Sequence, residues 1–182
     1  MTYQQAGRVA VVKRIAGWIV FIPAMLSTLI SLANLIHAFT ERKQGINGVM
    51  QDFLHLVVEV LRFNTPFLDI FWYNSPVPDF NQLQAISTIM FWLIYMLMFV
   101  GLAMQVSGAR LSRQVIHIRE GLEDQLILEK IKGVDGKTKT QLESLIILPR
   151  HTILVQYFPL YVLPVIVAAI GYMVLKLLGL AV

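Results

Sequence analysis

The residues best suited to chemistry in this sequence lie in the stretch DFLHLVVEVLRFNTPFLDIFWYNSP, at positions 52–76. Asp52, His55, Glu59, Arg62 and Asp69 are separated by three, four, three and seven residues, a spacing that places side chains along one stripe of an α-helix. A histidine and a carboxylate four residues apart share a helix face and can bind one metal ion. The same pattern also suits the water-facing side of an amphipathic helix.

A metal ion needs further ligands, and the other histidines of the sequence are His37, His117 and His151. We expect the last two on the opposite side of a membrane, for reasons of charge given below. Because too few ligands converge, we favour a solvated helix face and predict neither a bound metal nor a cofactor. Glu59 and Arg62, three residues apart, are expected to form a helical ion pair.

Two further groups of residues lie in the apolar run that precedes this stretch. Asn34 and His37 form a candidate polar pocket near the end of the run, although hydrogen bonding between helices or contact with lipid headgroups is the simpler interpretation. A candidate helix-packing stripe of small residues would let another helix approach closely. This stripe comprises Ala24, Ser27, Ser31 and Asn34.

Familiar catalytic motifs are absent from the sequence. It contains no HExxH and no GxSxG, and GVDGKTKT lacks the spacing of a P-loop. The chain has no cysteine, which excludes disulfides, thiolate metal sites and catalytic thiols. We therefore predict that the protein is not an enzyme.

Composition indicates the class of protein that holds these residues. Hydrophobic residues make up 57% of the 182 positions and charged residues 14%, whereas a soluble domain carries about 25% charged residues. Three apolar runs are near the roughly 20 residues that cross a bilayer, at 15–39, 85–106 and 153–175. We predict an all-α integral membrane protein with three transmembrane helices. Its net charge of +4 comes mainly from blocks beside the spans and does not indicate nucleic-acid binding.

The distribution of lysine and arginine predicts the orientation of the chain in the membrane. Residues 1–14 hold three basic residues, residues 107–151 hold eight, and residues 40–84 hold three. Because basic segments stay on the cytoplasmic side, we predict a cytoplasmic N-terminus, a periplasmic segment 40–84 and a periplasmic C-terminus. A fourth span through residues 53–72 would place the basic residues of 107–151 on the side of the membrane opposite the N-terminus. It would also place Glu59 and Arg62 near mid-membrane, at a cost of about 2.5–3.5 kcal/mol each.

Residues 53–72 are therefore predicted to form an amphipathic helix at the periplasmic interface of the membrane. Leu56, Val60 and Phe63 would face apolar surroundings, while the polar stripe faces water. Pro66 is expected to break the helix. An aromatic interfacial belt is expected from Phe71, Trp72, Tyr73 and Phe80.

Residues 107–151 are predicted to form a cytoplasmic helical hairpin. Its first arm continues the second span out of the membrane, and its second arm is the short helix TKTQLESLIILP, which Pro149 ends. The first arm carries an apolar stripe that is a candidate interface. The stripe comprises Leu111, Val115, Ile118 and Leu122. Lipid cannot cover it outside the membrane, so it must pack on the second arm, on another copy of the chain or on a partner.

Four segments resemble one known family. MTYQQAGRVAVVKRI, NTPFLDIFWYNSP, REGLEDQLILEK and PRHTILVQYF are similar to the YniB-like family of small enterobacterial inner-membrane proteins. The resemblance extends nearly from end to end, and it implies a bacterial inner-membrane location. It implies no activity and no functional residues.

Two functions are compatible with these observations. The small-residue stripe, the amphipathic cytoplasmic helix and the lack of catalytic motifs favour a protein that acts by association. It would lie among membrane lipids as a homo-oligomer or as an accessory subunit of a larger membrane complex. The alternative is a small transporter or channel subunit that uses the pocket at Asn34 and His37. The second and third spans are nearly purely apolar, which disfavours a pore.

Overall fold

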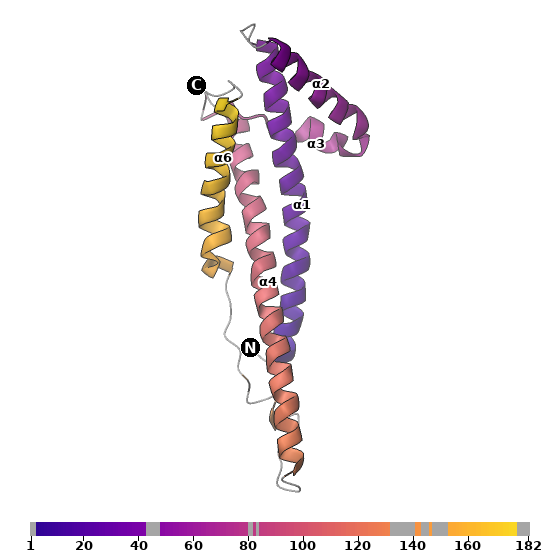
Figure 1. The fold of residues 1–182 in the computed structure, drawn as a ribbon, viewed down its shortest axis with the longest axis vertical. Helices are drawn as coiled ribbons and strands as arrows, with labels where there is room; N and C mark the ends of the chain where they lie inside the picture. Colours follow the sequence, from indigo (N-terminus) through magenta and orange to yellow (C-terminus); the bar gives the residue numbers. More distant parts are fainter. Residues whose placement is uncertain are drawn as a thin grey trace. The chain divides into compact units, whose positions relative to one another are not determined.

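The structure is a computed structural model that describes residues 3–42, 48–79, 82, 84–131, 141, 142, 146 and 153–177. Every regular element in these residues is a helix (Figure 1). The elements are α1 (Tyr3–Arg42), α2 (Gly48–Asn64), η1 (Pro66–Leu68), α3 (Asp69–Asn74), α4 (Ile86–Ile131), η3 (Ile153–Val155), η4 (Phe158–Val162) and α6 (Leu163–Leu177). The predicted all-α class is confirmed for this part of the chain.

Within the described residues, three stretches are long and apolar enough to cross a membrane: Gln5–Ala38, Ile86–Ile131 and Phe158–Leu177. This confirms the predicted number of membrane-spanning helices. The helices themselves extend further than the apolar runs. Helix α4 has 46 residues, or about 69 Å at 1.5 Å per residue, against a hydrocarbon thickness of about 30 Å. As predicted, the second span continues into one long helix.

The chain divides into two compact units, and α1 and α4 contribute to both. Unit 1 combines Met1–Ile19 with Val100–Tyr161, and unit 2 combines Val20–Phe99 with Val162–Val182. Most of the predicted second arm of the cytoplasmic hairpin, with Pro149, lies outside the described residues, as does Phe80.

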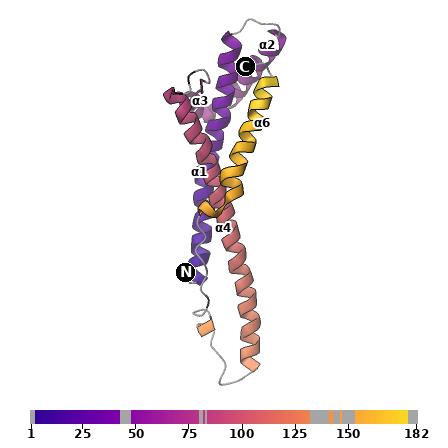
Figure 2. The ribbon, with the colours of Figure 1, turned by 90° about the vertical axis from the view of Figure 1, so that its left-hand side faces the viewer.

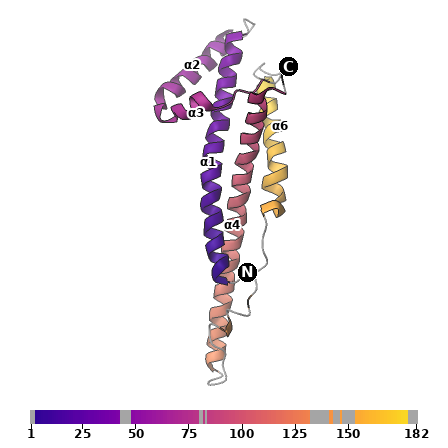
Figure 3. The ribbon, with the colours of Figure 1, turned by 180° about the vertical axis from the view of Figure 1, so that it is seen from behind.

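In unit 1, the first part of α1 lies beside α4 at a distance that only small residues permit (Figure 3). A Cβ atom on Gly17 would lie 2.8 Å from the carbonyl oxygen of Gly101, and one on Gly108 would lie 2.9 Å from that of Ala10. Since real Cβ atoms do not approach backbone oxygens so closely, both glycines are required by the helix pairing. From the sequence, Gly101 and Gly108, seven residues apart, were only weak evidence for helix packing, and Gly17 was not singled out.

Apolar and polar contacts accompany this close approach. Ala6, Ala10 and Leu111 form a buried cluster. Next to it, the ammonium group of Lys13 donates a hydrogen bond of 3.1 Å to the hydroxyl of Ser107, which is fully buried. The basic start of the chain is thus part of α1 and packs on α4, whereas hydropathy alone placed the start of the first span at residue 15.

In unit 2, α6 runs in the direction of α1 and opposite to α4 (Figure 2). One face of α4 is buried there, with Phe91, Tyr95 and Phe99 at successive helical turns. The hydroxyl of Tyr95 donates a hydrogen bond of 2.6 Å to the carbonyl of Pro164, which ties α4 to α6. Alternating helix directions are those expected of three consecutive spans joined by loops on opposite sides.

Candidate functional site

Several polar contacts lie at the turn that brings α2 and α3 against α1. Thr65, between α2 and η1, donates a hydrogen bond of 2.7 Å from its hydroxyl to the carbonyl of Leu61. The same hydroxyl oxygen accepts a bond of 3.1 Å from the indole N–H of Trp72. Pro66 follows directly and begins η1. Because Pro66 cannot continue α2, the chain turns here, as the sequence predicted.

Trp72 is the centre of the packing between α3 and α1. It is buried together with Ile30 of α1 and Val58 of α2. Partly buried residues complete this cluster: Ala33, Ile36, Leu68 and Phe71. Trp72 therefore lies within the protein core of unit 2, whereas the sequence analysis placed it in an aromatic belt at the membrane surface.

The predicted helix-packing stripe of α1 faces this same turn. The hydroxyl of Ser27 and the hydroxyl of Ser75 are 3.0 Å apart in a buried hydrogen bond. The side-chain amide of Asn34 donates a bond of 3.2 Å to the carbonyl of Trp72. Ala24 and Ser31 are also buried. Along much of its length, the stripe therefore contacts a segment of its own chain.

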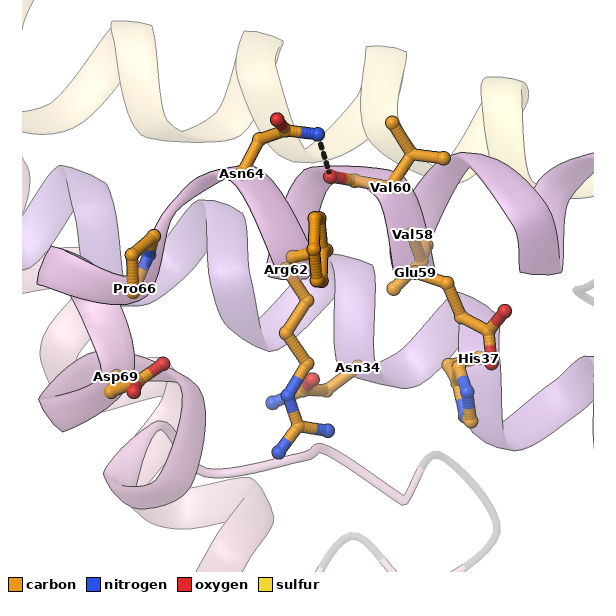
Figure 4. Close-up of a pocket in the computed structure, with 10 residues that line it drawn as sticks. Asn34, His37, Val58, Glu59, Val60, Arg62, Asn64, Pro66 and Asp69 are labelled. Carbon is orange, nitrogen blue, oxygen red and sulfur yellow. Dashed lines mark hydrogen bonds between the residues drawn. The ribbon is translucent and has the colours of Figure 1, made fainter.

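Asn34 and His37 also line an open pocket of about 960 Å³ between α1, α2 and the turn (Figure 4). Glu59 and Arg62 contribute to it from α2, and Asp69 contributes from α3. The structure thus places the two residues of the candidate polar pocket together with three of the five residues of the polar stripe.

His55 of the polar stripe lies against His37 of α1. The centres of the two imidazole rings are 4.4 Å apart, and the rings are tilted by 33°. His55 Nδ1 is 3.8 Å from Glu59 Oε1, and the potential ligand atoms of His37, His55 and Glu59 all lie within 4.8 Å of one another. The sequence analysis considered His55 with Glu59 but did not bring His37 to them, because they are far apart along the chain.

The other predicted contacts of the polar stripe differ from those observed. Glu59 pairs with His55, and the guanidinium of Arg62 lies 5.1 Å from the centre of the Tyr73 ring. The predicted ion pair between Glu59 and Arg62 is therefore wrong, since neither contact joins these two side chains. Leu56, Val60 and Phe63 are exposed, and Val60 and Phe63 also line the pocket. Asp52 is exposed as well.

The candidate cytoplasmic interface belongs to unit 1. Leu111 and Leu122 are buried. Val115 and Ile118 are partly buried beside the cluster of Ala6, Ala10 and Leu111, as is Ile146 of the predicted second arm. The start of α1 thus covers part of the stripe, a contact that the sequence analysis did not consider.

Comparison with known proteins identifies the family. The model of the YniB-like protein family matches residues 15–180. The chain therefore belongs to the YniB-like family. It is 61% identical over 179 residues to a protein of Yersinia pestis named "Putative YfeABCD regulator YfeE", covering 98% of this chain and 97% of the relative. It is 58% identical over 179 residues to "Uncharacterized protein YniB" of Escherichia coli (strain K12), covering 98% and 99%.

No solved structure matches this YniB-like chain. The matches to both relatives extend over nearly the whole chain, so they include α1, the turn with α2 and α3, α4 and α6 together. The resemblance inferred from four short segments is confirmed.

Proposed function

We propose that this YniB-like chain is a non-catalytic accessory protein of the bacterial inner membrane. It regulates another membrane-protein assembly by binding it through the charged half of α4. The observation that carries this proposal is a set of apolar side chains that α4 exposes after its charged residues begin. They are Ile116, Ile127, Leu128 and Ile131.

These side chains lie where lipid tails cannot cover them. Arg110 opens the charged half of α4, which also holds Arg113, Arg119, Glu120, Glu123 and Asp124. So many charges in hydrocarbon would each cost about 2.5–3.5 kcal/mol, so this half belongs in water. Exposed apolar residues in water mark a surface that binds another protein.

The exposed residues form their own face of α4. Ile116, Ile127 and Ile131 are 11 and four residues apart, so at about 100° per residue they lie within a narrow sector. The stripe of Leu111, Val115, Ile118 and Leu122 lies on roughly the opposite side and includes the contacts with α1. An internally packed stripe therefore leaves the Ile127 face available to a partner.

The name of one relative favours a different protein as that partner over a second copy of the chain. The Yersinia pestis relative is named a putative regulator of YfeABCD, and a regulator acts on something other than a second copy of itself. The identity of 61% over 98% of the chain supports the same kind of role here.

The distribution of basic residues supports one orientation of the chain in the membrane. We propose that the N-terminus and the charged half of α4 are cytoplasmic, and that the α2–α3 region and the C-terminus are periplasmic. The partner surface then faces the cytoplasm. The transporter alternative receives less support, because the Asn34 amide is already bonded to the Trp72 carbonyl and so helps to dock α3.

Photocrosslinking in intact cells tests the proposal. A photoreactive amino acid is placed at Ile127, and the matched control carries it at Gln125, which is also exposed but lies about 200° around the helix. We expect Ile127 to form an adduct with another membrane protein and Gln125 to form far less of it. Adducts at neither position, or adducts that contain only copies of this chain, would contradict the proposal.

A further inference from the structure

We propose that His37, His55 and Glu59 form a binding site for a divalent transition-metal ion, with Zn²⁺ the best match to the ligand types. Within the part of the chain that the structure describes, this is the group of three potential ligands that come together, with ligand atoms within 4.8 Å of one another. The inference is independent of the proposed regulatory role.

Packing between α1 and α2 brings the three side chains together. Val58 is buried against Ile30 and Trp72, and it lies three residues after His55 and one before Glu59. Because residues three apart share a helix face, burial of Val58 turns His55 toward α1. There it meets His37, whose ring centre is 4.4 Å from its own. Figure 4 shows the Glu59 carboxylate directed at His37.

The ligand types select the class of ion. Two imidazoles and one carboxylate suit Zn²⁺ and its first-row neighbours, whereas Mg²⁺ and Ca²⁺ prefer sites made of oxygen atoms. Three protein ligands leave a fourth position for water. The adjoining pocket, of about 960 Å³, has ample room for that water.

Only a small movement is needed to close the site. With metal–nitrogen distances of about 2.0–2.1 Å in a tetrahedral arrangement, ligand atoms lie about 3.3 Å apart. The present separations are 4.8 Å or less, a difference that side-chain rotation supplies. Glu59 has 65% of its side chain exposed, so rotation of its carboxylate meets little obstruction.

A second histidine–carboxylate pair in the chain provides a comparison for the proposed metal site. His117 Nδ1 lies 3.4 Å from Glu120 Oε2 on α4, and both side chains are mostly exposed. No third potential ligand joins this pair among the described residues. His117 is therefore a matched control: it has a nearby carboxylate on its own helix but no imidazole from another helix.

The experiment measures metal binding to the full-length protein in lipid nanodiscs, purified without a histidine tag. Co²⁺ is the probe, because its absorption bands report coordination, and Zn²⁺ is then added in competition. We expect one Co²⁺ per chain, displaced by Zn²⁺. His37→Gln, His55→Gln and Glu59→Gln should each weaken binding at least tenfold, since even loss of an outer partner of a ligand costs about 10–100-fold. His117→Gln should bind Co²⁺ as the unmodified chain does.

A stability measurement separates loss of ligands from loss of fold. Circular dichroism is recorded for each variant, and Zn²⁺ should raise the unfolding temperature of the unmodified chain and of His117→Gln but not of His37→Gln. The proposal is overturned if the unmodified chain binds neither ion at millimolar concentration. It is equally overturned if folded His37→Gln binds as tightly as the unmodified chain, or if His117→Gln loses binding to the same extent.

Discussion

The two parts of α1 are held by different kinds of contact. In unit 1, α1 meets α4 through Gly17 and Gly108, where each backbone approaches the other too closely for a Cβ atom. In unit 2, α1 meets α3 through Trp72 and through the side chains of Ser27 and Asn34. The α1–α4 contact depends on glycines, which have no side chain, whereas the α1–α3 contact depends on particular side chains. The α1–α4 contact at these glycines should therefore tolerate no added volume, while the α1–α3 contact should respond to loss of volume and of hydrogen bonds.

Removal of the Trp72 side chain should have the largest effect. Trp72→Ala empties the centre of the cluster with Ile30 and Val58 and leaves the Thr65 hydroxyl without its indole donor. We expect a loss of about 3–5 kcal/mol of unfolding free energy, measured by denaturant titration in detergent micelles. Phe67→Ala, which removes an exposed aromatic from η1, is the control and should cost far less. Equal losses in the two variants would contradict the role of Trp72.

The close approach in unit 1 is tested by adding one methyl group. In Gly108→Ala, the new Cβ atom would meet the carbonyl oxygen of Ala10 at 2.9 Å, so the helices must separate. We expect a loss of about 1–3 kcal/mol in the same titration. Gly121→Ala on the same helix meets nothing within 4 Å and should gain up to about 1 kcal/mol, because alanine favours the helix. The comparison fails if both substitutions change stability in the same direction.

The smallest effect is expected from a single polar contact in unit 2. Asn34→Ala removes the amide that donates to the Trp72 carbonyl, at a cost of about 0.5–1.5 kcal/mol. Asn64→Ala removes an exposed bond to the carbonyl of Val60 within α2, and its loss should be smaller because water replaces it. Amide hydrogen exchange in α3 provides the readout, and faster exchange is expected for Asn34→Ala alone. Unchanged exchange in α3 would show that Asn34 does not hold it.

The sequence predicted the elements better than their contacts. Apolar runs of about 20 residues identify spans because lipid requires them, and Pro66 marks the end of α2 because proline cannot continue a helix. Hydropathy did not find the start of α1, since a helix that leaves the membrane can carry Lys13 and Arg14 without losing its backbone hydrogen bonds. The class, the main break and the continuation of α4 beyond the second span were therefore predictable, while the start of α1 was not.

The candidate site was only half predictable. His55 and Glu59 share a face because they are four residues apart on one helix. The position of His37, 18 residues before His55, depends on how α2 folds back onto α1, which no local spacing encodes. Gly17 was missed and Gly108 gave only weak evidence for a similar reason: small residues are common in spans, and only the paired helix shows which ones are needed.

The central claim is our proposal that the α2–α3 region is periplasmic and the charged half of α4 is cytoplasmic, so that the membrane separates the candidate metal site from the partner surface. Because the chain has no cysteine, a single introduced cysteine reports directly on which side of the membrane it lies. Asn74→Cys and Gln125→Cys, both at exposed positions, are treated in spheroplasts with a membrane-impermeant maleimide. The account predicts labelling of Asn74→Cys in intact spheroplasts and of Gln125→Cys only after permeabilisation. Labelling of both in intact spheroplasts, or of Gln125→Cys alone, would contradict it.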